Sequence, residues 1–526
     1  AAPSAELLRA AKLFLTAPAK AAAEREDHSE DGPTAEGVLA EWLRSYGPRP
    51  LSWLVSGLGL DPGHVARWVD ALTEEGDLIV GPLTEGAEEA EICDAENLER
   101  LLAMLRRSRR QAYAPVGAER LVPFWARMHG TGSAGDPDEL VRLLDMLFGY
   151  AAPVNLWEGE IIPARLAEYY PVWLDGLFKE SPILWFGTGK ERIAFCLEED
   201  LPLFVTDSGA ESEGSSDVET LLRRTGHAEF WQIADKLDTS SKELTATLWD
   251  AAWRGAISND SFDTLRRGAL NRFAPSVGLA AETRASWPGR RQSARARQAW
   301  KSTRPLSGRW FALHEDDYGD DDLITQLERD KERARIVLAR YGVVFRELLE
   351  REIAPLRWRR LFRALRLMEL SGEVVAGSFI RGITGVQFAY EHVLRSLNED
   401  PDPEAIFWMS AADPISPCGL SLDAGYEELP PRVAGNHLVF RGTELVAISR
   451  RNGEELVFRV SPDDRDLARL VAPLRSLIGR RWNPKARVSV KVINGDDARS
   501  SPYTEPLVAA GFRRDYQKLV LRANYQ

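Results

Sequence analysis

The clearest pattern of apolar and polar positions along the chain lies between residues 334 and 390. Apolar residues there first recur every three or four positions, which is typical of amphipathic helices. After Gly372 they gather into two short segments that are typical of strands. The predicted elements are helices at 334–341, 345–351 and 358–370, then strands at 374–380 and 386–390 that meet at residues 382–385. Three helices followed by a two-stranded hairpin are the plan of a winged-helix domain.

The same order of elements recurs earlier in the chain. One copy spans residues 38–81, where Asp61 and Pro62 are typical of a helix start and Gly76 of a helix end. A second copy spans 140–197, and a partial copy spans 244–267. The repetition predicts an array of winged helices.

After Pro401 the apolar positions alternate instead, which is typical of strands. We expect strands at 437–449 and 455–460 with a type I′ turn at Asn452-Gly453, another strand at 487–493, and one long helix at 464–478. The predicted fold class is α+β, mainly helical, with tandem winged-helix domains before a small β-barrel or β-sheet domain. The expected domains are winged helices at 1–125, 126–206, 207–310 (with an acidic linker and a basic segment) and 311–400, and a β-barrel-like domain at 401–526.

Composition narrows the class of protein. The chain has 526 residues, of which 44% are hydrophobic, and no apolar run approaches the roughly 20 residues that a membrane span needs. Its 3 cysteines lie far apart, which argues against a disulfide framework and favours a cytoplasmic location. The first residue is Ala1, so we expect the chain to be part of a longer protein. The net charge of −13 argues against DNA binding over the whole surface, although local clusters decide the matter.

Clusters of basic residues with interleaved tryptophans are the main functional signal. Guanidinium groups suit phosphates, and aromatic rings can stack on bases. The alternative is that these arginines lie on solvated faces and are balanced by nearby acidic residues. The residues expected to contact DNA are Arg290, Arg291, Arg295, Arg297, Lys301, Arg357, Trp358, Arg359, Arg360, Arg363, Arg480 and Arg481.

Signals for catalysis are sparse. Residues 187–190 (GTGK) lack the spacing of a phosphate-binding loop, and the histidines and cysteines show no metal-ligand spacing, so we predict no cofactor and no metal for this chain. Asp260, with Asn259 as a polar partner, precedes a helix and could position water beside a sugar. The alternative is a helix cap, for which these residue types are favoured. Asp413 is equally usable and equally typical of a turn.

Several long stretches resemble the C-terminal region of the bacterial large helicase-related (Lhr) proteins. They are EIIPARLAEYYPVWLDGLF (160–178), LWDAAWRGAISNDSFDTLRRG (248–268), SGRWFAL (307–313), ARYGVVFRELL (339–349), GITGVQFAYEHV (382–393), AADPISPCG (411–419) and residues 492–522. The resemblance implies tandem winged helices and a β-barrel behind an ATPase core that would hold ATP and Mg. It also implies uracil excision, self-assembly into homo-oligomers, and an architecture similar to the AlkZ-type DNA glycosylases. The Gln-x-Gln motif of AlkZ is absent from the sequence.

Three functions follow from these observations. The first is a DNA-binding region of a DNA-repair helicase that, if catalytic, hydrolyses the N-glycosidic bond of a damaged base such as uracil through Asp260 and Asn259. The alternative is a non-catalytic oligomerisation or docking module for the helicase core, which the acidic net charge favours. A sequence-specific transcription regulator is weaker, because such a protein needs fewer winged helices.

Overall fold

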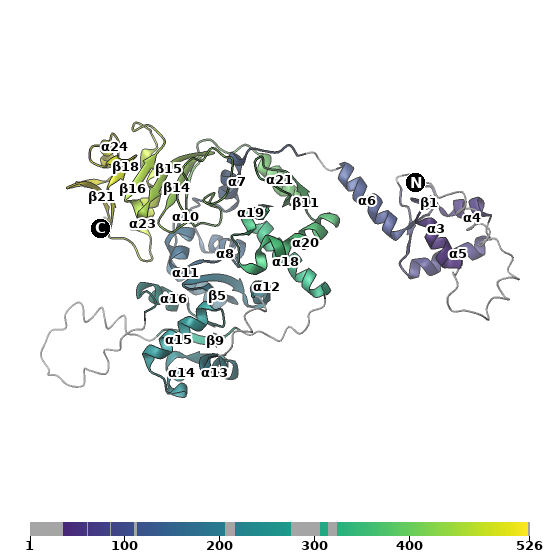
Figure 1. Cartoon of the computed structure of the whole chain (residues 1–526), viewed down its shortest axis with the longest axis horizontal. Coiled ribbons are helices and arrows are strands. Elements are labelled where there is room, and N and C mark those ends of the chain that lie inside the picture. The colour runs from purple at the N-terminus through teal and green to yellow at the C-terminus, as the bar shows by residue number, and fades with distance from the viewer. Residues whose placement is uncertain are drawn as a thin grey trace. The chain divides into compact units, whose positions relative to one another are not determined.

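The computed structural model describes residues 35–59, 61–84, 86–109, 113–205, 216–274, 306–313 and 323–523. It divides into two units, residues 1–112 with 370–372 and residues 113–369 with 373–526, and each is described by itself (Figure 1). Among the described helices, none combines the length and the apolar character that crossing a membrane requires.

The first unit has the order of a winged helix. It contains α3 (Ala35–Leu43), β1 (Arg49–Pro50), α4 (Leu51–Leu58), α5 (Pro62–Glu74), β2 (Leu78–Gly81), β3 (Glu91–Asp94) and α6 (Ala95–Arg109), with strand order β1-β3-β2. The Asp61 carboxylate accepts a hydrogen bond from the His64 backbone N–H (3.1 Å), which confirms the predicted cap of α5. Val65, Val69 and Leu72 on this helix are buried in the core of the unit.

Three further winged helices follow in the second unit. The first, which we call the second winged helix, contains η1 (Ala118–Arg120), α7 (Leu121–Met128), α8 (Pro137–Met146), β4 (Ala152–Pro153), α9 (Val154–Leu156), the π-helical turn η2 (Trp157–Ile161), α10 (Ile162–Arg165), α11 (Pro171–Glu180), β5 (Ile183–Gly189) and β6 (Arg192–Leu197). Its strand order is β4-β6-β5. The short η3 (Glu198–Asp200) and α12 (Leu201–Phe204) lead out of it.

The third winged helix contains α13 (Asp217–Thr225), β7 (Ala228–Glu229), α14 (Phe230–Leu237), α15 (Ser241–Trp253), β8 (Ile257–Asn259), α16 (Phe262–Leu270) and β9 (Arg309–Ala312), in strand order β7-β9-β8. The fourth contains α18 (Leu323–Tyr341), β10 (Val343–Val344), α19 (Arg346–Leu349), η5 (Ala354–Leu356), α20 (Trp358–Leu370), β11 (Val375–Gly377), β12 (Gln387–Ala389) and α21 (Glu391–Asn398), in strand order β10-β12-β11. These elements confirm the winged-helix pattern that the sequence predicts.

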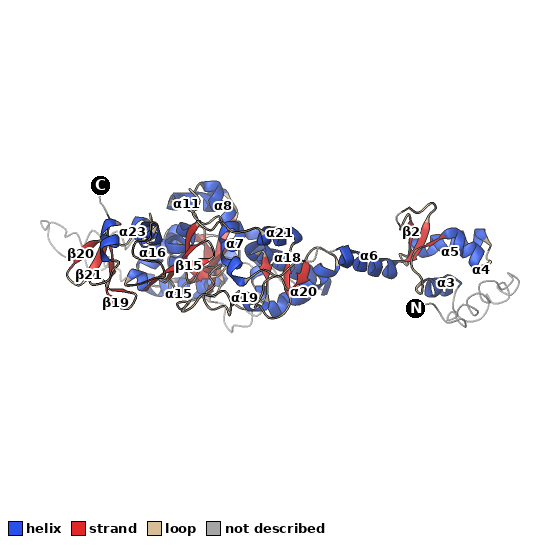
Figure 2. Cartoon of the chain, turned by 90° about the horizontal axis from the view of Figure 1, so that it is seen from above, coloured by secondary structure: helices blue, strands red, loops and turns tan. Residues whose placement is uncertain are grey.

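The C-terminal part holds two open sheets. The larger sheet contains β13 (Ile406–Ser410), β14 (His437–Arg441), β15 (Glu444–Arg450), β16 (Glu455–Phe458), β18 (Val492–Ile493) and β19 (Asp496–Asp497), in that order. The smaller sheet has the order β17-β21-β20, formed by β17 (Arg487–Val490), β20 (Arg513–Asp515) and β21 (Lys518–Arg522). Around them lie η6 (Arg451–Gly453), α22 (Leu467–Leu470), α23 (Ala472–Gly479) and α24 (Thr504–Ala509). Figure 2 shows β19, β20 and β21 at the C-terminal end of the chain.

Four sequence predictions for this part need correction. The barrel is wrong: in the described chain β13 and β19 end the larger sheet without pairing with each other, so it stays open. The segment 437–449 is two strands, β14 and β15, because the chain turns at Gly442. The long helix at 464–478 is two short helices, because Pro473 at the start of α23 has no N–H to continue α22. The type I′ turn expected at Asn452-Gly453 is also wrong, because the loop spans four residues, 451–454, between the paired Arg450 and Glu455.

Candidate nucleic-acid interface

The third helices of the winged helices in the second unit differ in charge. In helix-turn-helix proteins this helix enters the major groove. Helix α11 carries Lys179 with Asp175 and Glu180, and α15 carries one lysine with two acidic residues. Helix α20 carries four arginines and one glutamate. Only α20 of these three therefore has the charge that a phosphate backbone needs.

Helices α11 and α15 also take part in packing between winged helices. Asp175 on α11 pairs with Arg266 of α16 at 2.6 Å. Helix α15 packs on β5, where a Cβ at Gly187 would lie 1.9 Å from the Ala252 carbonyl oxygen. Because the side chain of glycine is a single hydrogen, this close approach is possible. Gly187 therefore lies in an internal contact between β5 and α15.

Helix α20 buries one face and exposes the other. Leu361, Leu365 and Met368 point into the core. Arg359 and Arg363 lie one turn apart on the exposed face. Within the described part of the chain, neither guanidinium has a hydrogen-bond or ion-pair partner. These two arginines are free to bind an anion.

The other predicted residues on and beside α20 are already engaged. Arg360 Nε contacts both carboxylate oxygens of Asp330, at 2.9 and 3.0 Å. Arg357 Nε donates to the Glu352 carbonyl oxygen at 3.1 Å. Trp358 is half-buried, with its ring 5.9 Å from that of Phe388.

Arg480 and Arg481, the two predicted contacts after α23, also differ: one is engaged within the protein and the other is accessible. Arg480 donates to the carbonyl oxygens of Gly159 (2.9 Å) and Asn483 (3.0 Å), and burial lowers the pKa of its guanidinium. Arg481 is exposed and lies 5.1 Å above the ring of Tyr170. Arg480 is therefore a link between elements, whereas Arg481 stays accessible. The predicted contacts Arg290, Arg291, Arg295, Arg297 and Lys301 lie outside the described residues.

Asp260 and Asn259 lie at the end of β8. Asp260 accepts hydrogen bonds from the backbone N–H (2.7 Å) and Nε (2.9 Å) of Arg309, and 31% of its side chain is exposed. Asn259 is buried, and its Oδ1 accepts from the Ser261 backbone N–H at 2.9 Å. The cap residue of α16 is Ser261, so Asp260 fixes β9 rather than capping that helix. The carboxylate is thus held in one orientation at the surface.

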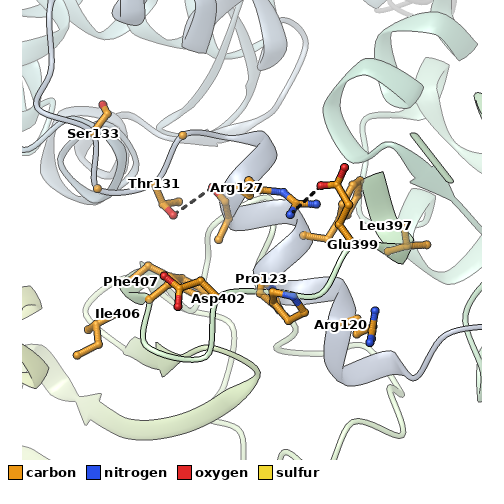
Figure 3. Close-up of a pocket in the computed structure, with 16 residues that line it drawn as sticks. Arg120, Pro123, Arg127, Thr131, Ser133, Leu397, Glu399, Asp402, Ile406 and Phe407 are labelled. Carbon is orange, nitrogen blue, oxygen red and sulfur yellow. Dashed lines mark hydrogen bonds and ion pairs between the residues drawn. The ribbon is translucent and has the colours of Figure 1, made fainter. Parts of the chain in front are cut away.

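A cavity of about 460 Å³ lies elsewhere, between α7, the turn at 130–133, the end of α21 and the start of β13 (Figure 3). Its apolar wall includes Phe124 and Phe407, and Asp402 lies at its edge. Arg127, which also lines the cavity, pairs with Glu399 at 3.2 Å. No sequence motif predicts this cavity, because its walls come from segments more than 260 residues apart.

A buried polar network around η2 and α10 was also missed. Glu158 on η2 accepts from Arg266 Nε at 2.7 Å and from the Tyr169 hydroxyl at 2.5 Å, and burial raises its pKa. Arg165 on α10 forms a bidentate pair with Asp413, with distances of 2.7 and 2.8 Å. These residues lie in or directly beside the stretches 160–178, 248–268 and 411–419 that resemble the Lhr proteins. That resemblance was the signal in the sequence that could have pointed to them.

The comparisons with known proteins agree with this architecture. Residues 115–198 and 324–406 each match a family described as "Large helicase-related protein, winged-helix domain". The chain carries two winged-helix domains of the Lhr family. An Lhr protein of Mycolicibacterium smegmatis, named "Lhr helicase/ probable uracil glycosylase", is 26% identical over 523 residues, which cover 92% of this chain and 33% of that protein.

A second Lhr protein, the "Lhr helicase/uracil glycosylase" of Escherichia coli K12, is 27% identical over 415 residues, covering 73% of this chain and 26% of that protein. The chain thus spans about a third and a quarter of the lengths of these relatives. Among solved structures, the DNA glycosylase AlkZ of Streptomyces sahachiroi is similar with a TM-score of 0.37 and 13% identity, covering 72% of this chain and all of AlkZ.

Proposed function

We propose that this chain is the DNA-engaging region of an Lhr-type helicase and that it holds duplex or branched DNA through the phosphates. Both relatives are named as helicases and are several times longer than the matched segment. The ATPase core, with its ATP and Mg, would lie in the rest of such a protein. The DNA contact in this chain would carry little base specificity.

The observation that carries this proposal is the exposed pair Arg359 and Arg363 on α20. Each of these two guanidinium groups can donate two parallel hydrogen bonds to the oxygens of a phosphate. The neighbouring Arg360 is held by Asp330, which also pairs with Arg333, so Arg359 and Arg363 are the two of these arginines that stay without a partner.

Salt-dependent binding tests the proposal. Fluorescence anisotropy with a labelled duplex would compare the full chain with its Arg359→Ala/Arg363→Ala variant over a range of salt concentrations. Two lost phosphate contacts should reduce the slope of log K against log salt by about 2. Arg360→Ala is the matched control and should change the slope little. An unchanged slope in the double variant would remove α20 from the interface.

A second candidate function, DNA glycosylase activity, is favoured by the names of both relatives. In this proposal a base leaves the duplex stack, and water attacks C1′ of its sugar as the N-glycosidic bond breaks; the proton that water loses ends on the departing base. Asp260, held by Arg309, would orient the water, and Asn259 would support the loop. The cavity beside Asp402 lies within the size range of small-molecule pockets and is an alternative place for the base.

The assay for this activity uses uracil-containing and undamaged oligonucleotides, followed by alkali. Uracil-dependent breaks that disappear in Asp260→Asn, but persist in Asp402→Asn, would assign the chemistry to Asp260. The opposite result would assign it to the cavity. If no breaks form while DNA binding remains, the chain is a binding module. Light scattering would then test the alternative role as a homo-oligomeric docking module for the helicase core.

A further inference from the structure

The smaller C-terminal sheet, β17-β21-β20, has two chemically different faces. Its pairings place Val488 opposite Leu521 and Val490 opposite Leu519, and these four side chains belong to the hydrophobic core below the sheet. Side chains alternate between the faces of a sheet, so the residues between them point the other way.

That outer face is strongly basic. Arg487 lies directly opposite Arg522, and Arg513 lies opposite Val520, one pair further along the same face. All three arginines are exposed, and in the described chain none of their guanidinium groups has a hydrogen-bond or ion-pair partner. Like charges directly opposite each other destabilise a sheet unless an anion lies between them. The arrangement therefore favours an anionic ligand.

An exposed aromatic ring lies at the tip of the same hairpin. Tyr516 connects β20 to β21 and is 83% exposed, the highest value among the large apolar residues of the described chain. Its φ is +48°, a conformation that bulky residues rarely adopt. The Arg499 guanidinium donates to the Tyr516 carbonyl oxygen, so the turn that carries the exposed ring is held in place.

We propose that the outer face of β17-β21-β20 binds single-stranded nucleic acid, with phosphates on Arg487, Arg513 and Arg522 and an unpaired base stacked on Tyr516. Single-strand sites combine a positively charged surface along the sugar–phosphate backbone with aromatic rings on which bases stack. Within a duplex the faces of each base are covered by the stacked neighbouring base pairs, so Tyr516 selects unpaired strands. This inference builds on the proposed DNA binding and adds a second surface, distinct from α20.

The test measures binding of the full chain to a labelled oligo-dT of about 12 nucleotides. Tyr516→Ala should weaken this binding about tenfold, and Tyr516→Phe, which keeps the ring, should not. Arg513→Ala/Arg522→Ala should reduce the salt slope by about 1.4. Arg514→Ala is the matched control, because Arg514 is on the same hairpin but faces the core side and pairs with Glu505. Thermal unfolding would confirm that each variant is folded.

The outcomes separate this proposal from the first one. Hairpin variants should leave duplex binding unchanged, and the α20 double variant should leave oligo-dT binding unchanged. If the hairpin variants bind oligo-dT as tightly as Arg514→Ala does, the single-strand site is wrong whatever α20 does. If the α20 variant alone has no effect on duplex DNA, the first proposal fails while the hairpin result stands.

Discussion

Buried charges at single residues hold the second unit together. Arg165 and Asp413 are almost completely buried, and their bidentate contact is a neutral pair that satisfies most of its hydrogen-bonding groups. His129 completes the group: its Nδ1 accepts from Arg165 at 3.1 Å, and its Nε2 donates to the Arg340 carbonyl oxygen at 2.8 Å. Because both ring nitrogens are used in this way, the imidazole is neutral.

This geometry predicts a pH dependence of stability. Burial, reinforced by the charge of Arg165, lowers the pKa of His129 from 6.5 to about 3. Between these two values the unfolded chain binds one more proton at this position than the folded chain does. The contribution of His129 to the free energy of unfolding is therefore complete above pH 6.5 and falls by up to about 1.4 kcal/mol for each pH unit below it.

Urea unfolding of the wild type and of His129→Gln, between pH 7 and pH 4, isolates this contribution. Glutamine keeps one acceptor and one donor but does not titrate. The difference in unfolding free energy between wild type and variant should therefore shrink as the pH falls. A difference that stays constant across this range would show that His129 is not held neutral.

At the scale of elements, the sequence predicts what local patterns determine. The apolar stripe of α20 and the glycine after it were sufficient to place this helix and its hairpin, and the cap at Asp61 placed α5. The single helix expected at 464–478 failed because the apolar spacing continues through Pro473, where the backbone cannot. The barrel failed because strand patterns carry no information on closure, which depends on pairing between distant strands.

In the candidate site, too, local patterns were predicted and contacts between distant residues were not. Sequence reasoning found α20 as a basic helix, but not which of its arginines stay free. That distinction depends on Asp330, which lies on α18, 30 residues before Arg360. Likewise Glu158 and Arg266 lie 108 residues apart, so no local pattern joins them.

At the scale of the whole second unit, the winged helices share one interior. A continuous hydrophobic core runs from Val116 to Ile448, and it includes residues of the second, third and fourth winged helices. Leu438 and Phe440 on β14 belong to this core, whereas Val439 between them belongs to the separate core of the C-terminal part. The larger sheet is therefore buried on both faces at β14, where it couples the C-terminal part to the winged helices.

That coupling makes a prediction for Asp413, which joins the C-terminal part to Arg165 on α10. Asp413→Ala leaves the buried guanidinium unpaired, which should lower the free energy of unfolding by about 3–5 kcal/mol. Because the core is shared, the thermal transition of the second unit should shift as a whole, without a separate early melting of the C-terminal part.

Asp400→Ala, which breaks the exposed pair with Arg120, should cost no more than about 1 kcal/mol. Replacing both partners, in Arg165→Met/Asp413→Leu, should restore most of the loss, since no buried charge then remains. Calorimetry that shows two separated transitions in Asp413→Ala would mean that the sheet is not coupled to the winged helices.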